Sequence, residues 1–124
     1  MREIKFRAWV LKDWAEEDKE MEMCYDLAFE DYEPINDLLA NVTNLMQYTG
    51  LKDKNGVEIY EGDIVRVLFR NKIEELVGEI SMPKSCWCVG YKTDKGYYRH
   101  ARTAQFSEFE VIGNIHENPE LLKN

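Results

Sequence analysis

The chain of 124 residues is long enough for one domain with a sizeable core, because 44% of its residues are hydrophobic and 12% are aromatic. It contains no apolar run near the ~20 residues that a membrane helix needs. No apolar segment follows the charged start either, so we expect neither a membrane span nor a secretory signal. The three cysteines, an odd number, are typical of reduced thiols in the cytoplasm.

The net charge of −8 is unevenly distributed along the chain. Residues 1–63 carry 7 basic and 16 acidic side chains, whereas residues 64–103 carry 8 basic and 4 acidic ones. The last part, residues 104–124, carries 1 basic and 4 acidic side chains. One interpretation is a solvated acidic surface that keeps the protein soluble. The other is an acidic lobe that faces a basic lobe, within one molecule or between subunits.

The N-terminal segment predicts a β-hairpin. Apolar side chains alternate with polar or partly exposed ones over residues 4–9, as expected for a strand with one buried face. Residues 21–25 alternate in the same way, so they predict a second, antiparallel strand after an acidic connection. Residues 34–40 are compatible either with one or two helical turns or with a loop.

Two predicted turns frame the centre of the chain. Asn55 and Gly56 both tolerate positive φ, which favours a tight turn between apolar segments. Gly62 and Asp63 mark a second turn, after which residues 64–69 alternate as a strand with one buried face. We therefore assign structural turn roles to Asn55, Gly56, Gly62 and Asp63.

The second half of the chain predicts a small barrel. Apolar segments between turn residues predict further strands at residues 76–80, 86–91, 97–100 and 109–115. A flat sheet of such strands would leave two exposed edges, which a closed barrel removes. The expected fold class is mainly β (α+β): an SH3-like β-barrel in the C-terminal half, with the N-terminal β-hairpin and short helical segments packed on it.

The tail predicts a single helical turn. Asn118 suits the N-cap position, and Pro119 suits the first helical position. Leu121 and Leu122 would then pack on the body of the protein.

No internal repeat, low-complexity tract or Gly/Ser linker marks a domain boundary. We therefore predict a single domain over residues 1–124. Within it, residues 1–45 form a hairpin and acidic subregion, and residues 46–124 form the barrel-like subregion.

Several blocks of sequence stand out along the chain: residues 4–9 (IKFRAW), 46–56 (MQYTGLKDKNG), 59–65 (IYEGDIV), and 111–115 with 118–121 (VIGNI and NPEL). Together these blocks resemble the YopX family of phage and prophage proteins. The resemblance implies a phage or prophage origin, the cytoplasm of a bacterial host cell, and a β-rich YopX-like domain. The family is one of unassigned molecular function, so the resemblance supplies no catalytic residue. The chain departs from the family pattern at Val10 and in a longer acidic tract over residues 16–22.

The sequence lacks residues that a structural zinc site or a catalytic thiol would need. A structural zinc site usually takes two ligand pairs, and Cys86 with Cys88 is one pair without a second. His100 could serve either thiol as a base, but no Gly-rich elbow surrounds the cysteines. The remaining soft ligands are His116 and the distant Cys24. We predict buried free thiols, no metal and no cofactor.

Four carboxylates could approach one another at a barrel mouth, as paired acids do in hydrolases. They are Glu58, Glu61, Asp63 and Glu117. Glu61 and Asp63, however, suit a role in shaping the turn. No glycine spacing fits a phosphate loop or a dinucleotide fingerprint. We predict no catalytic residue and a protein that is not an enzyme.

The basic, aromatic strands carry the candidate binding surface. Aromatic side chains among cations suit single-stranded nucleic acid or a protein interface, although they also suit a barrel core. We expect a non-enzymatic interaction module that binds a protein partner or itself. The alternative is nucleic-acid binding by the basic face, and no small-molecule substrate is identified. The residues assigned to this surface are Arg66, Lys92, Tyr98, Arg99 and Arg102.

Overall fold

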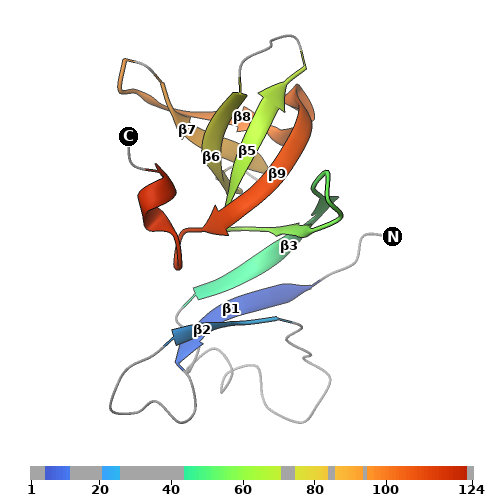
Figure 1. Cartoon of the computed structure of the whole chain (residues 1–124), viewed down its shortest axis with the longest axis vertical. Coiled ribbons are helices and arrows are strands. Elements are labelled where there is room, and N and C mark those ends of the chain that lie inside the picture. Colours follow the sequence, from blue (N-terminus) through green and yellow to red (C-terminus); the bar gives the residue numbers. More distant parts are fainter. Residues whose placement is uncertain are drawn as a thin grey trace. The chain divides into compact units, whose positions relative to one another are not determined.

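The computed structural model describes residues 5–11, 21–25, 44–70, 75–83, 86–93 and 95–122 (Figure 1). Strands dominate this part of the chain, so the mainly β fold is confirmed, and helix is limited there to two single turns of 3-10 helix. Residues 34–40, with their two alternative predictions, lie outside the described residues.

Internal contacts divide the chain into two compact units, residues 1–48 and residues 49–124. The organisation as a single domain with two subregions stays a prediction. We describe each unit by itself.

The first unit contains the predicted hairpin. β1 (Phe6–Leu11) pairs antiparallel with β2 (Met21–Cys24). β3 (Asn44–Lys52) pairs antiparallel with the other side of β1. The sequence predicted only an apolar segment before the turn at Asn55 and Gly56, and the structure shows that this segment is a nine-residue strand. Gly50 has a φ of 86°, a conformation outside the regular strand region.

A buried arginine distinguishes the first unit. Alternation along β1 predicted Arg7 on a partly exposed face, but its side chain is only 2% exposed. Its Nη1 donates a hydrogen bond to the Tyr25 hydroxyl at 3.4 Å, and its Cζ lies 5.7 Å from the centroid of the same ring. A cation over an aromatic face keeps favourable electrostatic contact out of water. Both faces of β1 are therefore partly covered.

The second unit begins with the last residues of β3, which are followed by β4 (Glu58–Tyr60). The Thr49 hydroxyl donates to the carbonyl oxygen of Ile59 at 2.7 Å and accepts the backbone N–H of Leu51 at 3.1 Å. One side chain thus satisfies backbone groups on both sides of the β3–β4 turn.

The larger sheet of the second unit has five antiparallel strands in the order β8-β7-β6-β5-β9 (Figure 1). Among the described residues its end strands, β8 and β9, do not pair with each other. The sheet therefore curls into a half-barrel, whereas the sequence predicted a closed barrel. The SH3-like assignment stays a prediction. The strands are β5 (Asp63–Phe69), β6 (Glu75–Ser81), β7 (Cys88–Lys92), β8 (Tyr98–Arg102) and β9 (Phe106–Asn114).

The curl has a visible cause in the pairing of β5 with β9. Register shifts occur between Ile64 and Val65 and between Leu68 and Phe69. Each shift leaves one surplus residue on β9, which has nine residues against seven in β5. Bulges of this kind bend a strand and increase its twist. β9 also begins at Phe106, earlier than the residue 109 that the sequence predicted.

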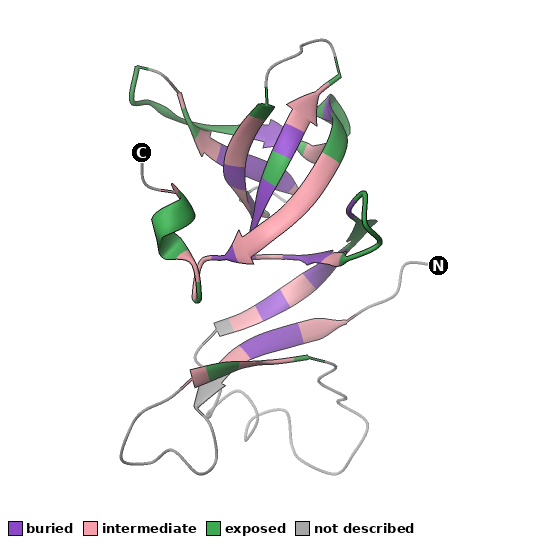
Figure 2. Ribbon diagram, viewed as in Figure 1, coloured by how far each residue is buried: buried purple, intermediate pink, exposed green. Residues whose placement is uncertain are grey.

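One face of the five-stranded sheet forms the core of the second unit (Figure 2). Phe69 and Trp87 pack against this core while remaining partly exposed. The residues of β5 to β8 that alternate with the core positions form the opposite face, which we call the outer face. The core residues are Ile59, Val65, Val67, Ile80, Val89, Ala101 and Phe106.

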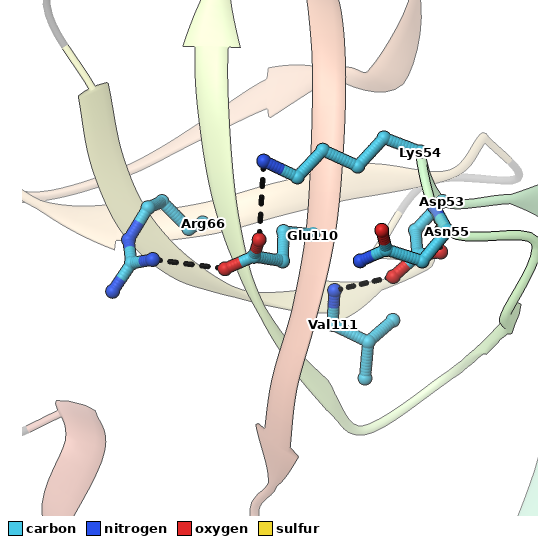
Figure 3. A network of polar contacts seen from close by, with 6 residues as sticks. All are labelled: Asp53, Lys54, Asn55, Arg66, Glu110 and Val111. Carbon is cyan, nitrogen blue, oxygen red and sulfur yellow. Dashed lines mark hydrogen bonds and ion pairs between the residues drawn. The ribbon is translucent and has the colours of Figure 1, made fainter.

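A buried carboxylate joins the turn after β3 to β9 (Figure 3). Asp53 is 8% exposed, and its Oδ1 accepts the backbone N–H groups of Asn55 at 2.8 Å and Val57 at 2.9 Å. Its Oδ2 accepts the backbone N–H of Val111 at 2.9 Å. Burial alone would raise the pKa of Asp53, but these three N–H groups outweigh it and hold the pKa below its ordinary value.

Both predicted turns contain glycines with positive φ, 83° at Gly56 and 88° at Gly62. The Gly62 N–H donates to the carbonyl oxygen of Ile80 at 2.9 Å, and its carbonyl accepts the N–H of Ile115 at 2.9 Å. Next to it, Asp63 Oδ2 accepts the Tyr60 N–H at 2.8 Å. The second turn is therefore tied to two other segments through its backbone.

The tail forms one turn of 3-10 helix, η2 (Pro119–Leu122), after the turn that follows β9. Asn118 directly precedes this helix, which is the N-cap position that the sequence predicted, although its side-chain oxygen is not directed at the helix. Asn118 Oδ1 instead accepts the backbone N–H of Asn114 at 3.3 Å, and the Leu121 N–H reaches the Asn118 carbonyl at 3.1 Å. The side chain faces back toward β9, where it satisfies the last residue of that strand.

We expect Asp53→Asn to lower the free energy of unfolding by about 2–3 kcal/mol near neutral pH, because an amide N–H₂ replaces one acceptor oxygen. Since the folded-state pKa is lowered, the carboxylate stabilises the fold above its unfolded pKa, and this stabilisation is lost as the pH falls through the folded pKa. Urea unfolding at several pH values measures both effects. Glu108→Gln, at an exposed position of β9, is the control. A difference that stays constant on acidification would contradict the assignment.

We expect Gly62→Val to lower the free energy of unfolding by more than about 2 kcal/mol, because a β-branched residue at a φ of 88° is strained. Gly62→Ala should cost less, since alanine tolerates this region better than valine. Thermal and urea unfolding of both variants measure the difference. A melting curve of Gly62→Val that matches wild type would refute the turn assignment.

Candidate binding groove

An open groove of about 350 Å³ lies on the second unit, where η2 approaches β6. Strands β6, β7 and β8 supply most of its wall, and η2 supplies the rest. Most of the lining residues are apolar or aromatic, and two are charged. They are Glu75, Leu76, Val77, Tyr91, Lys92, Tyr98, Leu121 and Leu122, together with the backbone of Gly90.

Strand pairing determines which residues form the polar side of the groove. Lys92 on β7 lies opposite Tyr98 on β8, so both side chains belong to the outer face. The turn between them is closed by the Thr93 hydroxyl, which accepts the Tyr97 N–H at 3.1 Å. Lys92 and Tyr98 are exposed, and Tyr98 keeps 59% of its surface accessible. A cation and a phenol are therefore available to a ligand beside apolar walls.

Gly90 sets the depth of the groove floor. A methyl group added at Gly90 would lie 2.9 Å from Cζ of Tyr98, so the tyrosine ring rests on the glycine backbone. Tyr98 also makes an edge-on contact with His100, with 5.1 Å between ring centroids. The missing side chain at Gly90 thus holds Tyr98 close to the sheet.

A titratable row borders the groove. Glu79, Gly90 and His100 lie opposite one another on three neighbouring strands, so the carboxylate and the imidazole flank a glycine. Burial raises the pKa of Glu79, the charge of Glu61 adds to the rise, and His100 opposes it. Burial and then the charge of Glu79 raise the pKa of Tyr98. The Tyr98 hydroxyl therefore stays protonated and can donate a hydrogen bond to a ligand.

The structure separates the five residues that the sequence grouped as a binding surface. Lys92 and Tyr98 both line the groove. Arg66 donates from Nη1 to Glu110 Oε1 at 2.8 Å, so its charge is paired (Figure 3). Arg99 alternates with Tyr98 and faces the other side of β8. Arg102 lies opposite Cys88, away from the groove lining.

The groove also uses residues that the sequence interpretation missed. Val77 and Gly90 were taken only as parts of strands, and Leu121 was expected to pack on the body. Leu121 is instead 37% exposed at the rim. The one sequence feature that pointed to the groove was the pair of leucines in a short helical tail. Nothing in the sequence, however, indicates that this tail contacts β6.

The candidate catalytic groups do not converge in the described residues. His100 lies opposite Gly90, whereas Cys88 lies opposite Arg102, so the register gives this thiol a guanidinium neighbour instead of an imidazole. Asp63 serves its turn by accepting a backbone N–H. The described part of the chain holds no group of three or more His, Cys, Asp or Glu residues placed to bind a metal ion. It also holds no helix with the length and apolar character of a membrane span.

Comparison with known proteins finds a matching family and similarity to a solved structure. The sequence profile of the family described as "YopX protein" matches residues 5–123. The crystal structure of protein EF1440 from Enterococcus faecalis is similar to this chain, with 26% sequence identity and a TM-score of 0.52. The match covers 99% of this chain and 100% of that one. No curated protein matches this sequence.

We expect Glu79→Gln to raise the melting temperature by a few degrees near neutral pH. Because the folded-state pKa of Glu79 is raised, its contribution to stability is complete below the unfolded pKa and is lost as the pH rises through the folded pKa. The amide cannot ionise, so the difference from wild type should disappear in acid. Thermal melts from acid to neutral pH measure this, with Glu75→Gln on the same strand as the control. A stabilisation that persists unchanged in acid would contradict the interpretation.

Proposed function

This chain belongs to the YopX family, and we propose that it acts as a non-enzymatic interaction module of phage or prophage origin in the cytoplasm of a bacterial host. Its SH3-like half-barrel would bind one extended, acidic segment of a protein partner. The groove between the outer face and η2 is the observation that carries this proposal.

The lining of the groove supports a ligand with both apolar and acidic groups. Val77 and Leu121 offer apolar surface, and burial of an aliphatic side chain there gains about 25 cal/mol for each Å² removed from water. Lys92 and the protonated Tyr98 hydroxyl can both donate to a carboxylate. Glu75 can accept a backbone N–H of the bound segment.

Charge supports an acidic partner over a neutral one. Residues 64–103 carry 8 basic and 4 acidic side chains, although the chain as a whole is strongly acidic. Complementary charge speeds association and disfavours partners of the wrong sign. A second copy of this chain also has acidic residues to offer, which makes self-association one outcome of the test.

Nucleic-acid binding remains the second candidate because an exposed tyrosine beside a lysine suits a stacked base and its phosphate. The paired charge of Arg66 and the carboxylates Glu75 and Glu79 on the same face weigh against it. A phosphate backbone would approach these acids as well as the cations.

The test starts with selection from a displayed random peptide library on the immobilised full chain. We expect enriched peptides with an acidic residue next to an aliphatic one. Tyr98→Ala should weaken binding of the best peptide at least ten-fold, about 1.4 kcal/mol, because the phenol forms part of the wall. Tyr97→Ala is the matched control, since Tyr97 is 66% exposed and lies outside the groove lining. Equal losses in both variants would refute the groove as the binding site.

Charge reversal tests the acidic partner separately. Lys92→Glu should shift the selected peptides from acidic to basic, whereas Lys95→Glu, outside the lining, should leave the selection unchanged. Single-stranded oligonucleotides at low salt and light scattering of the free protein test the other two occupants. Salt-sensitive binding of the oligonucleotides that Tyr98→Ala abolishes would favour nucleic acid instead. A dimer that Tyr98→Ala dissociates would favour self-association.

A further inference from the structure

Two cysteines lie side by side at the start of β7. Cys86 occupies a bend, and Cys88 is the first residue of the strand. Their Sγ atoms are 3.6 Å apart. A disulfide bond is about 2.05 Å long, so a small closure of the bend would bring the sulfurs to bonding distance.

The two thiols differ in their access to solvent. Cys86 is partly exposed, whereas Cys88 is only 5% exposed. Burial raises the pKa of Cys88, and its hydrogen bond with Cys86 raises it further, while Arg102 opposes this effect. Cys88 therefore holds its proton, and Cys86 is the thiol that an external reagent can reach.

The neighbours of Cys88 could stabilise a sulfur anion when it forms. Ser81 on β6 and Arg102 on β8 lie opposite Cys88 on its two sides. The Ser81 hydroxyl is buried and has no hydrogen-bond partner within the described residues. A hydroxyl donor and a guanidinium thus lie on either side of the thiol in the same row of the sheet. Positive charge and N–H or O–H donors near a sulfur favour its thiolate form.

We propose that Cys86 and Cys88 form a thiol–disulfide exchange site for low-molecular-weight disulfides. The thiolate of Cys86 attacks one sulfur of the reagent, breaks its S–S bond and releases the first thiolate. Cys88 gives its proton to that leaving thiolate and then attacks the sulfur of Cys86. The second half of the reagent leaves and takes up the proton from the ionisation of Cys86. The protein loses two hydrogen atoms, and the reagent disulfide becomes two thiols.

The third cysteine provides an internal comparison. Cys24 lies on β2 in the first unit, and its Sγ contacts the carbonyl oxygen of Tyr25 at 4.0 Å. It is partly exposed like Cys86. Reaction of Cys24 with the same reagent can only give a mixed disulfide unless a second protein molecule joins it.

The experiment uses the full chain with Cys24→Ser, oxidised glutathione as the probe, and exclusion of air and metal ions. Intact mass and peptide mapping should show a disulfide between Cys86 and Cys88, with glutathione only transiently attached. Adding Cys88→Ala should trap glutathione on Cys86, because no second thiol can displace it. Adding Cys86→Ala should slow modification of the remaining thiol at least about ten-fold, because it is buried.

Thermal melts of each variant before oxidation show that the fold is intact, and Cys→Ser versions of both positions provide a second set if an alanine variant unfolds. The proposal is overturned if the Cys24→Ser protein accumulates the mixed disulfide as the trapped variant does. It is also overturned if the thiols at positions 86 and 88 react with glutathione at the same rate, or if neither reacts while the protein stays folded.

Discussion

The second unit depends on a carboxylate that is paired with the backbone instead of with a cation. Asp53 accepts two N–H groups from its own turn and one from Val111 on β9. The N–H of Lys54 also donates to the carbonyl of Phe109 at 3.0 Å, and its ammonium reaches Glu110 at 3.1 Å. Since β9 is the edge strand that pairs with β5, this turn fixes one edge of the five-stranded sheet. A buried acid of this kind is stable only while all its donors remain in place.

The segments that identify the family and the segments that form the groove are largely different. Asp53, Asp63 and Asn114 lie in the family blocks, and their side-chain oxygens all accept backbone N–H groups. These blocks therefore encode turns and strand ends. The groove comes mostly from β6, β7 and β8, with η2 as its fourth wall. The same three strands also supply the core residues Ile80, Val89 and Ala101, so they contribute to the fold as well as to the groove.

What could be predicted from the sequence was local in origin. Gly56 and Gly62 mark turns because glycine adopts a positive φ at no steric cost, and alternation was enough to predict the first hairpin. The contact of Asp53 with Val111 spans 58 positions, and that of Arg66 with Glu110 spans 44, so neither has a local signal. The register also places Tyr98 and Arg99, which the sequence grouped in one surface, on opposite faces of β8. Adjacent residues of one strand point to opposite faces, so alternation along the sequence was enough to separate these two side chains.

The surplus residues of β9 have a consequence for how this fold tolerates change. The bend of the sheet arises from a difference in length between two paired strands, nine residues against seven, and only indirectly from which side chains they carry. Substitutions along β9 can accumulate without altering the arc, provided that the core positions stay apolar. A single deletion in the same stretch would remove one bulge and flatten that part of the sheet. It would also move the side chains that follow to the opposite face. The curvature therefore depends on the number of residues in β9. Evolution can substitute residues of this strand far more freely than it can insert or delete them.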